Sequence, residues 1–101
     1  MKSEDKYIEM LKVMVLDHFK DDDIKIFMFG SRASEGNTAQ SDVDIGLYSE
    51  NGIDKAKKSL LIEKIENSNI PYKVDIVDFS EVSEGFRELA MKDAVLWKDS
   101  H

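Results

Sequence analysis

Two carboxylates and a Gly-Ser pair stand close together in the stretch "MFGSRASEGNTAQSDVDIGLY", residues 28–48. An apolar run ends at Gly30-Ser31, ten residues follow, and Asp42 and Asp44 then appear one residue apart in a second apolar run. Alternate residues of a β-strand share a face, so these two carboxylates would lie about 7 Å apart and repel each other. Their neighbours in the strand are apolar and offer no counter-charge. A bound divalent cation would remove the repulsion, and oxygen ligands at this spacing suit Mg²⁺.

A third carboxylate is selected by the alternation of side chains in "YKVDIVDF", residues 72–79. The stretch is typical of a β-strand, in which Asp75 shares one face with Lys73 while Asp78 lies on the opposite face. If this strand lies beside the strand that carries Asp44, Asp75 can join the acidic pair and Asp78 cannot. The sequence therefore predicts Asp75 as the third acid.

The Gly-Ser pair is typical of a place where the backbone approaches a bound anion. Gly30 allows a sharp turn and a close approach to a ligand. Ser31 is expected to open a short helix, "SRASE", whose free N–H groups form an anion site. Arg32 either clamps a phosphate or forms a surface ion pair. A phosphate site beside a magnesium-binding acidic pair is what nucleotidyl transfer requires, because one ion activates the attacking hydroxyl and a second steadies the leaving pyrophosphate.

Hydrophobic periodicity predicts the alternating helices and strands that would position these residues. The expected helices cover residues 4–20 and 54–67, and the expected strands cover 24–29, 42–48 and 72–79. Ser80 is expected to cap a last helix through Phe86, Leu89 and Ala90, and "AVLW" closes the chain. The mostly apolar strand 24–29 is expected at the centre of the sheet. The predicted fold class is α/β (α+β), a small mixed sheet of three to four strands flanked by helices.

Composition limits the functions that the chain can have. Its 101 residues predict a single domain, 1–101, and a net charge of −7 argues against direct nucleic-acid binding. No apolar run approaches the roughly 20 residues of a membrane span, and the charged start "MKSEDKYIEM" is unlike a signal peptide. The absence of cysteine excludes thiolate chemistry and predicts a cytoplasmic location.

Other residues near the predicted site are interpreted as packing or surface groups. Tyr48 shares the face of the acidic pair and either stacks on a base or fills the core, and we expect the core. Arg87 is expected at the surface, and Trp97 as a packing anchor or partner contact. The lysines within 55–58 are expected to form a solvated helix face.

The spacing of these motifs resembles a known family. Gly30-Ser31, ten residues, and then Asp42 and Asp44 resemble the GS-x10-DxD signature of minimal nucleotidyltransferases in the DNA polymerase β-like superfamily, and "VDIVD" matches the strand that carries the third acid. The resemblance covers most of the chain. It implies a polymerase β-like palm fold, ATP as substrate, and two Mg²⁺ ions held by Asp42, Asp44 and Asp75. By the same resemblance Gly30 and Ser31 would hold the β- and γ-phosphates, and Asp75 would assist deprotonation of the acceptor.

Family members of this length resemble the antitoxin half of a two-component bacterial or archaeal module. The chain is expected to lack room for the acceptor-binding domain of polymerases and antibiotic-modifying relatives. The resemblance then implies a helical HEPN-type ribonuclease toxin as partner, with AMP moved from ATP to a tyrosine of that toxin. Two alternatives stay open: a small-molecule (aminoglycoside-like) nucleotidyltransferase that completes its acceptor site as a homo-oligomer, and an antitoxin that blocks its partner by binding without chemistry.

Overall fold

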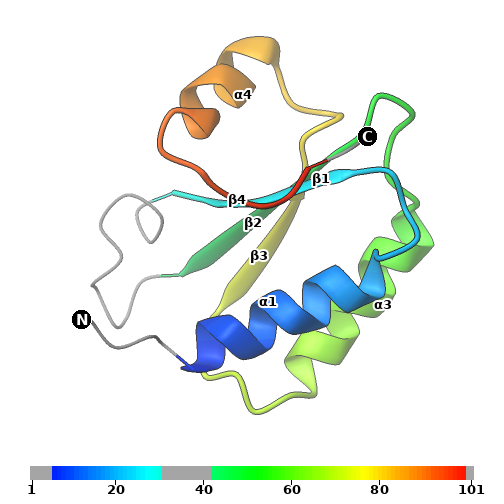
Figure 1. Ribbon diagram of the computed structural model, residues 1–101, viewed down its shortest axis with the longest axis vertical. Coiled ribbons are helices and arrows are strands. Elements are labelled where there is room, and N and C mark those ends of the chain that lie inside the picture. Colours follow the sequence, from blue (N-terminus) through cyan, green and yellow to red (C-terminus); the bar gives the residue numbers. More distant parts are fainter. Residues whose placement is uncertain (1–5, 31–41, 100–101) are drawn as a thin grey trace.

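A four-stranded mixed β-sheet forms the centre of the described part of the chain, residues 6–30 and 42–99, in this computed structural model (Figure 1). In chain order the elements are α1 (Lys6–His18), β1 (Lys25–Phe29), β2 (Val43–Tyr48), α3 (Lys55–Glu66), β3 (Val74–Asp78), α4 (Glu84–Met91) and β4 (Val95–Lys98). Across the sheet the order is β3-β2-β1-β4, so the apolar strand β1 is internal, as its sequence predicts. The mixed sheet with flanking helices confirms the predicted fold class.

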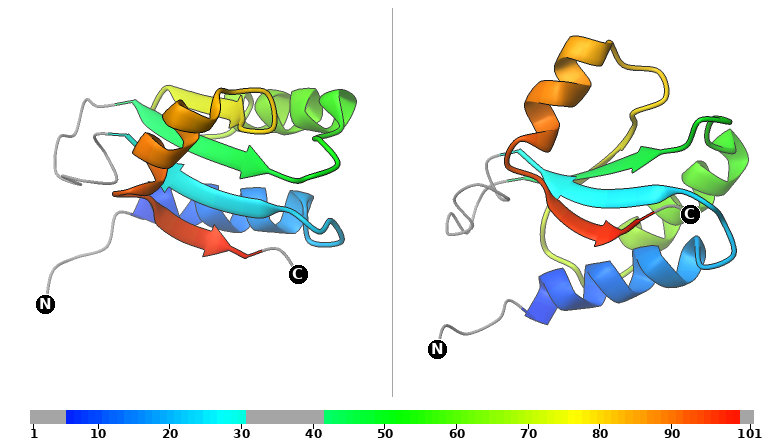
Figure 2. Two further views of the ribbon diagram at one scale, coloured as in Figure 1. Left: turned by 90° about the horizontal axis from the view of Figure 1, so that it is seen from above. Right: turned by 45° about the horizontal axis from the view of Figure 1, so that its top comes forward.

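The two faces of the sheet carry different residues, because side chains alternate along each strand. Helices α1 and α3 cover one face, and α4 lies across the other (Figure 1, Figure 2). Under α1 and α3 the buried side chains are mostly aliphatic, with Phe19 as the aromatic exception, and include Leu11, Val15, Ile26, Val43, Ile45, Leu47, Leu61, Ile65 and Ile76. On the other face the buried side chains are aromatic: Phe27, Phe29 and Phe79 pack against Ala90 and Met91 of α4.

Strand pairing follows from the connections between the elements. Strand β1 pairs antiparallel with both β2 and β4, whereas β2 and β3 run parallel. A parallel pair needs a crossover, and α3 provides it between β2 and β3. The register places Asp44 opposite Asp75 and Gly46 opposite Val77.

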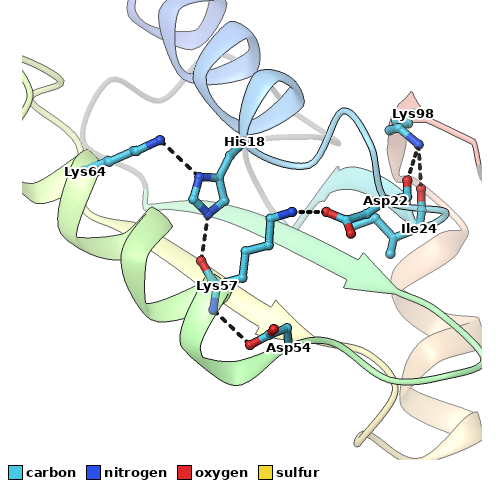
Figure 3. A network of polar contacts seen from close by, with 7 residues as sticks. All are labelled: His18, Asp22, Ile24, Asp54, Lys57, Lys64 and Lys98. Atoms are coloured by element: carbon cyan, nitrogen blue, oxygen red, sulfur yellow. Dashed lines mark hydrogen bonds and ion pairs between the residues drawn. The ribbon is translucent and has the colours of Figure 1, made fainter.

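Long-range polar contacts tie the end of α1 to α3 and to β4 (Figure 3). The Nε2 atom of His18 donates to the carbonyl oxygen of Lys57 at 2.7 Å, and its Nδ1 accepts from the ammonium of Lys64 at 3.2 Å. Lys57 forms an ion pair with Asp22, and the ammonium of Lys98 donates to the carbonyl oxygen of Asp22 at 2.8 Å. The lysine face expected over 55–58 is therefore only partly solvated, because Lys57 is half-buried and pairs with Asp22 in the connection between α1 and β1.

One expected helix cap is wrong. Ser83, not Ser80, caps α4, and its hydroxyl accepts from the backbone N–H of Phe86 at 3.2 Å. Ser80 is held in a turn instead, because its N–H donates to the Asp78 carboxylate at 2.9 Å and its hydroxyl donates to the carbonyl oxygen of Ser49 at 3.1 Å. These bonds hold the chain in a turn directly after β3, so that α4 begins three residues later than its sequence suggests.

The aromatic residues at the ends of the sheet pack largely as predicted. Trp97 packs against the aliphatic core, and Tyr48 packs against the aromatic one. Arg87 lies half-buried with its guanidinium carbon 4.6 Å from the centroid of the Tyr48 ring.

Within the described ranges no helix is both long and apolar enough to cross a membrane.

Candidate functional site

The parallel pairing of β2 and β3 brings Asp44 and Asp75 together. The two residues are direct partners in the register, and partners in a parallel pair point to the same face. At the start of the two strands the N–H of Val43 donates to the carbonyl oxygen of Lys73 at 2.9 Å, which fixes this alignment. The shared face is that of α4, because Asp44 is also opposite Phe29 of the aromatic core. The alternation argument for Asp75 is therefore confirmed in the backbone register.

The carboxylates in and beside β2 and β3 differ in how far they are exposed to solvent. Asp42 precedes the first residue of β2 and is exposed, as is Asp75, whereas Asp44 is half-buried. Asp78 faces the side of α1 and α3, where it is 8% exposed and accepts the N–H of Ser80. The structure thus separates Asp75 from Asp78 in the way the strand period requires.

Asp44 is in an unfavourable electrostatic environment. Its pKa is raised above the ordinary value of 3.8, first because burial disfavours the charged form, and then because Asp75 and Asp42 repel it. Within the described residues none of the three carboxylates forms an ion pair with a lysine or arginine. The site therefore holds negative charge for which this part of the chain supplies no counter-charge.

Gly30, the residue that follows β1, lies close to the carboxylate of Asp44. Its φ angle is +84°, a left-handed conformation that favours glycine, and a Cβ at this position would lie 2.4 Å from Oδ2 of Asp44. The backbone thus approaches the carboxylate more closely than any side chain would allow. Ser31 and Arg32, the other predicted phosphate-binding residues, lie outside the described residues, as does the short helix "SRASE".

The fit of a metal ion can be judged from the three acids. Among residues 6–30 and 42–99, no three His, Cys, Asp or Glu side chains are gathered closely enough to hold an ion by themselves. Mg²⁺ does not need such a cage, because it binds through one or two carboxylates and completes its shell with waters and substrate phosphates. Carboxylate oxygens that repel one another, and for which the described ranges supply no counter-charge, suit such an ion.

The middle of the α4 face is closed by an aromatic cluster that sequence reasoning missed. A Cβ on Gly46 would lie 2.4 Å from the ring of Phe27 and 2.8 Å from that of Phe79. The ring centroids of Phe27 and Phe79 are 4.9 Å apart, and Phe86 of α4 stacks on Phe79 at 5.6 Å. A glycine inside an apolar strand is the available signal, since it often marks a close approach.

The fold and the site together define a domain of the nucleotidyltransferase class. The chain belongs to the Polymerase beta, Nucleotidyltransferase family, whose model matches residues 15–101. This match confirms the family that the GS-x10-DxD spacing predicts.

A curated relative and two solved structures give the comparison more detail. The chain is 34% identical over 70 residues to the "Probable protein adenylyltransferase MntA" of Haemophilus influenzae, and the match covers 69% of this chain and 61% of that protein. The fold is similar to a chain in the crystal structure of a toxin-antitoxin with AMP-PNP, with a TM-score of 0.68, 19% identity and coverage of 89% and 74%. It is also similar to a chain in the structure of a tri-AMPylated Shewanella oneidensis HEPN toxin in complex with MNT antitoxin, with a TM-score of 0.64, 18% identity and coverage of 91% and 72%. At these identities the solved structures show the fold.

Proposed function

We propose that this protein is a magnesium-dependent protein adenylyltransferase that moves AMP from ATP to a tyrosine hydroxyl of a HEPN-type toxin. The observation that carries the proposal is the in-register pair of Asp44 and Asp75 beside the Gly30 turn. Burial and repulsion by neighbouring carboxylates both disfavour the charged form of Asp44 and raise its pKa. A structural aspartate would accept hydrogen bonds, as Asp78 does.

The residues divide the reaction between them. Asp42, Asp44 and Asp75 would hold Mg²⁺, which supplies activation of the acceptor hydroxyl and stabilisation of the leaving pyrophosphate. Asp75 is exposed and so is placed to take the proton of the acceptor hydroxyl. The acceptor oxygen bonds to the α-phosphorus of ATP, and the bond from that phosphorus to the pyrophosphate breaks. Gly30 would let the backbone approach the phosphates, with Ser31 and Arg32 beside it.

The partner is proposed from the relatives. The H. influenzae relative is named as a protein adenylyltransferase, and the solved neighbours are complexes of a toxin with an antitoxin, one of them tri-AMPylated. A net charge of −7 also suits contact with the basic surface of an RNA-cleaving protein. The chain has no cysteine, which supports action in the cytoplasm.

The test is transfer of label from ATP, marked in its α-phosphate, to a HEPN-type toxin, taken from the genes that adjoin this one. With Mg²⁺ we expect label on the toxin, and we expect its loss when a chelator is added or when a tyrosine of the toxin is changed to phenylalanine. Asp44→Asn should lower transfer about a hundredfold or more, because the amide keeps an oxygen but removes the negative charge with which a carboxylate binds Mg²⁺. Label that stays in ATP under all conditions would contradict the proposal.

Asp78→Asn is the matched control for the acidic residues. It makes the same chemical change only three residues from Asp75, and the amide oxygen can still accept the N–H of Ser80. Transfer by Asp78→Asn should stay within a few-fold of the wild type, while Asp75→Asn should lose it. Toxin that is neutralised equally well by Asp44→Asn would instead favour inhibition by binding. Label on an aminoglycoside would favour the small-molecule alternative.

A further inference from the structure

A cleft lies on the α4 face of the sheet, at the end of β2 away from Asp44. Its volume is about 500 Å³, within the range of about 300–1,000 Å³ that small-molecule sites occupy. The floor is formed by Phe27 and by Lys25 and Tyr48, which are opposite each other where β1 begins and β2 ends. The wall is the second half of α4, with Arg87, Glu88, Met91 and Lys92.

This cleft is separate from the proposed nucleotide site. Asp44 and Tyr48 are four residues apart on β2, roughly 13 Å at the rise of a strand. Between them lies Gly46, which the Phe27 ring covers so closely that a Cβ would be 2.4 Å away. Helix α4 crosses the same face of the sheet (Figure 2), and its Phe86 stacks on the aromatic cluster. The aromatic side chains thus fill the space between the two ends.

The charge of the cleft is opposite to that of the whole chain. Lys25, Arg87 and Lys92 line it with one acidic residue, Glu88, in a chain of net charge −7. Within the described residues none of these three cations forms an ion pair. Glu88 and the carbonyl end of α4 disfavour an anion beside Lys92, at the helix C-terminus, which directs a negative group toward Lys25 and the guanidinium of Arg87.

Arg87 is already oriented for such a group. Its guanidinium carbon lies 4.6 Å from the centroid of the Tyr48 ring, so the planar group rests on the aromatic face. Stacking holds the guanidinium without using its N–H groups, which remain able to donate to a carboxylate or a phosphate. The apolar surfaces of Phe27 and Met91 lie in the same cleft.

We propose that this cleft binds a small organic anion, with a flat apolar body beside Tyr48 and Phe27 and an oxyanion held by Arg87 and Lys25. The ligand class is an aromatic or similarly flat phosphate or carboxylate. The proposal does not depend on the proposed adenylyl transfer, since it uses none of the acidic residues.

The test is a titration followed by amide NMR spectra of the full chain with naphthyl phosphate, naphthoate, naphthol and inorganic phosphate. Naphthyl phosphate or naphthoate should shift the signals of Lys25, Tyr48 and the Arg87 side chain, and the stronger of the two identifies the oxyanion. Naphthol and inorganic phosphate should each bind at least about tenfold more weakly, because each lacks one half of the recognition. Binding should weaken with added salt.

Variants decide whether the named residues are responsible. Arg87→Gln should weaken binding about tenfold or more, and Lys25→Gln should weaken it severalfold. The matched control is Lys12→Gln, the same change on α1 across the sheet, and it should bind as the wild type does. Asp44→Asn should also bind normally, which separates this proposal from the catalytic one.

Several results would overturn the proposal. These are the absence of shifts in the cleft, equal binding of naphthol, unchanged binding by Arg87→Gln in a folded protein, and displacement of the probe by ATP. Displacement by ATP would make the cleft a part of the nucleotide site instead.

Discussion

Substitution of Gly30 by alanine tests how closely the backbone approaches the acidic site. The new Cβ would meet Oδ2 of Asp44 at 2.4 Å, and the φ angle of +84° would be strained for any L side chain. Gly52 provides a matched control, because its φ angle is +86° and a Cβ there would meet nothing within 4 Å. The two variants share the backbone strain and differ in the contact with the carboxylate.

The magnitudes follow from this difference. Left-handed strain should lower the free energy of unfolding by about 1–2 kcal/mol in Gly52→Ala. Gly30→Ala should lose about 1 kcal/mol more, at the low end for overpacking, because the Asp44 side chain is only half-buried and can move. That movement misplaces the carboxylate, and a shift of about 1 Å can lower the rate of transfer a hundredfold.

The assay is urea unfolding in chelator, combined with the transfer reaction in Mg²⁺. In an Asp44→Ala background the added loss from Gly30→Ala should vanish, because the clashing oxygen is gone. The reasoning is refuted if Gly30→Ala and Gly52→Ala lose the same stability in both backgrounds, or if Gly30→Ala transfers AMP at the wild-type rate.

Three further perturbations test the packing and electrostatics of the same sheet. Asp44→Asn in chelator should be more stable than the wild type at neutral pH, because a raised carboxyl pKa makes the native state less stable above that pKa. The difference, followed by urea unfolding across pH, should shrink as the pH falls toward 3.8 and below, and Mg²⁺ with ATP should stabilise only the wild type. Gly46→Ala should lower the free energy of unfolding by about 2–3 kcal/mol, because the two buried rings beside it must move. Gly85→Ala is the control, because a Cβ there would meet nothing within 4 Å, and it should not lower the free energy of unfolding. Thermal melts of both variants check this. His18→Leu removes the hydrogen bond to the Lys57 carbonyl and should lower stability by about 1 kcal/mol in urea, and His18→Gln, which can still donate, should lower it less.

The sequence predicts most of the sheet because its information is local and periodic. Once this strand is assumed to lie beside the strand of Asp44, the alternation in 72–79 places Asp75 with Asp44 and Asp78 on the opposite face, and the register confirms both. The central position of β1 follows in the same way from a run with few polar residues. The strand period changes face at every residue, so a one-residue error would have reversed the assignment.

The sequence does not predict contacts that depend on which distant segments meet. Ser80 and Ser83 are equally good cap residues by type. Ser80 does not cap α4 because it is hydrogen-bonded to the Asp78 carboxylate and the Ser49 carbonyl instead. The bond of His18 to Lys57 joins residues 39 apart in the sequence. The cleft beside Tyr48 likewise depends on where α4 crosses the sheet, which no local pattern encodes.

A comparison of Asp44 with Asp78 indicates that Asp44 is best explained by function. Both lie in the same sheet, but Asp78 is buried and has a backbone N–H as its partner, whereas Asp44 has only like charges near it among the described residues. A sequence shaped by stability alone would favour an amide or an apolar residue at position 44, because the charge there opposes folding. A residue that breaks this local rule without a compensating contact is expected at a functional site. Residues 6–30 and 42–99 supply no such compensation for Asp44, and a cation carrying a nucleoside triphosphate would supply it.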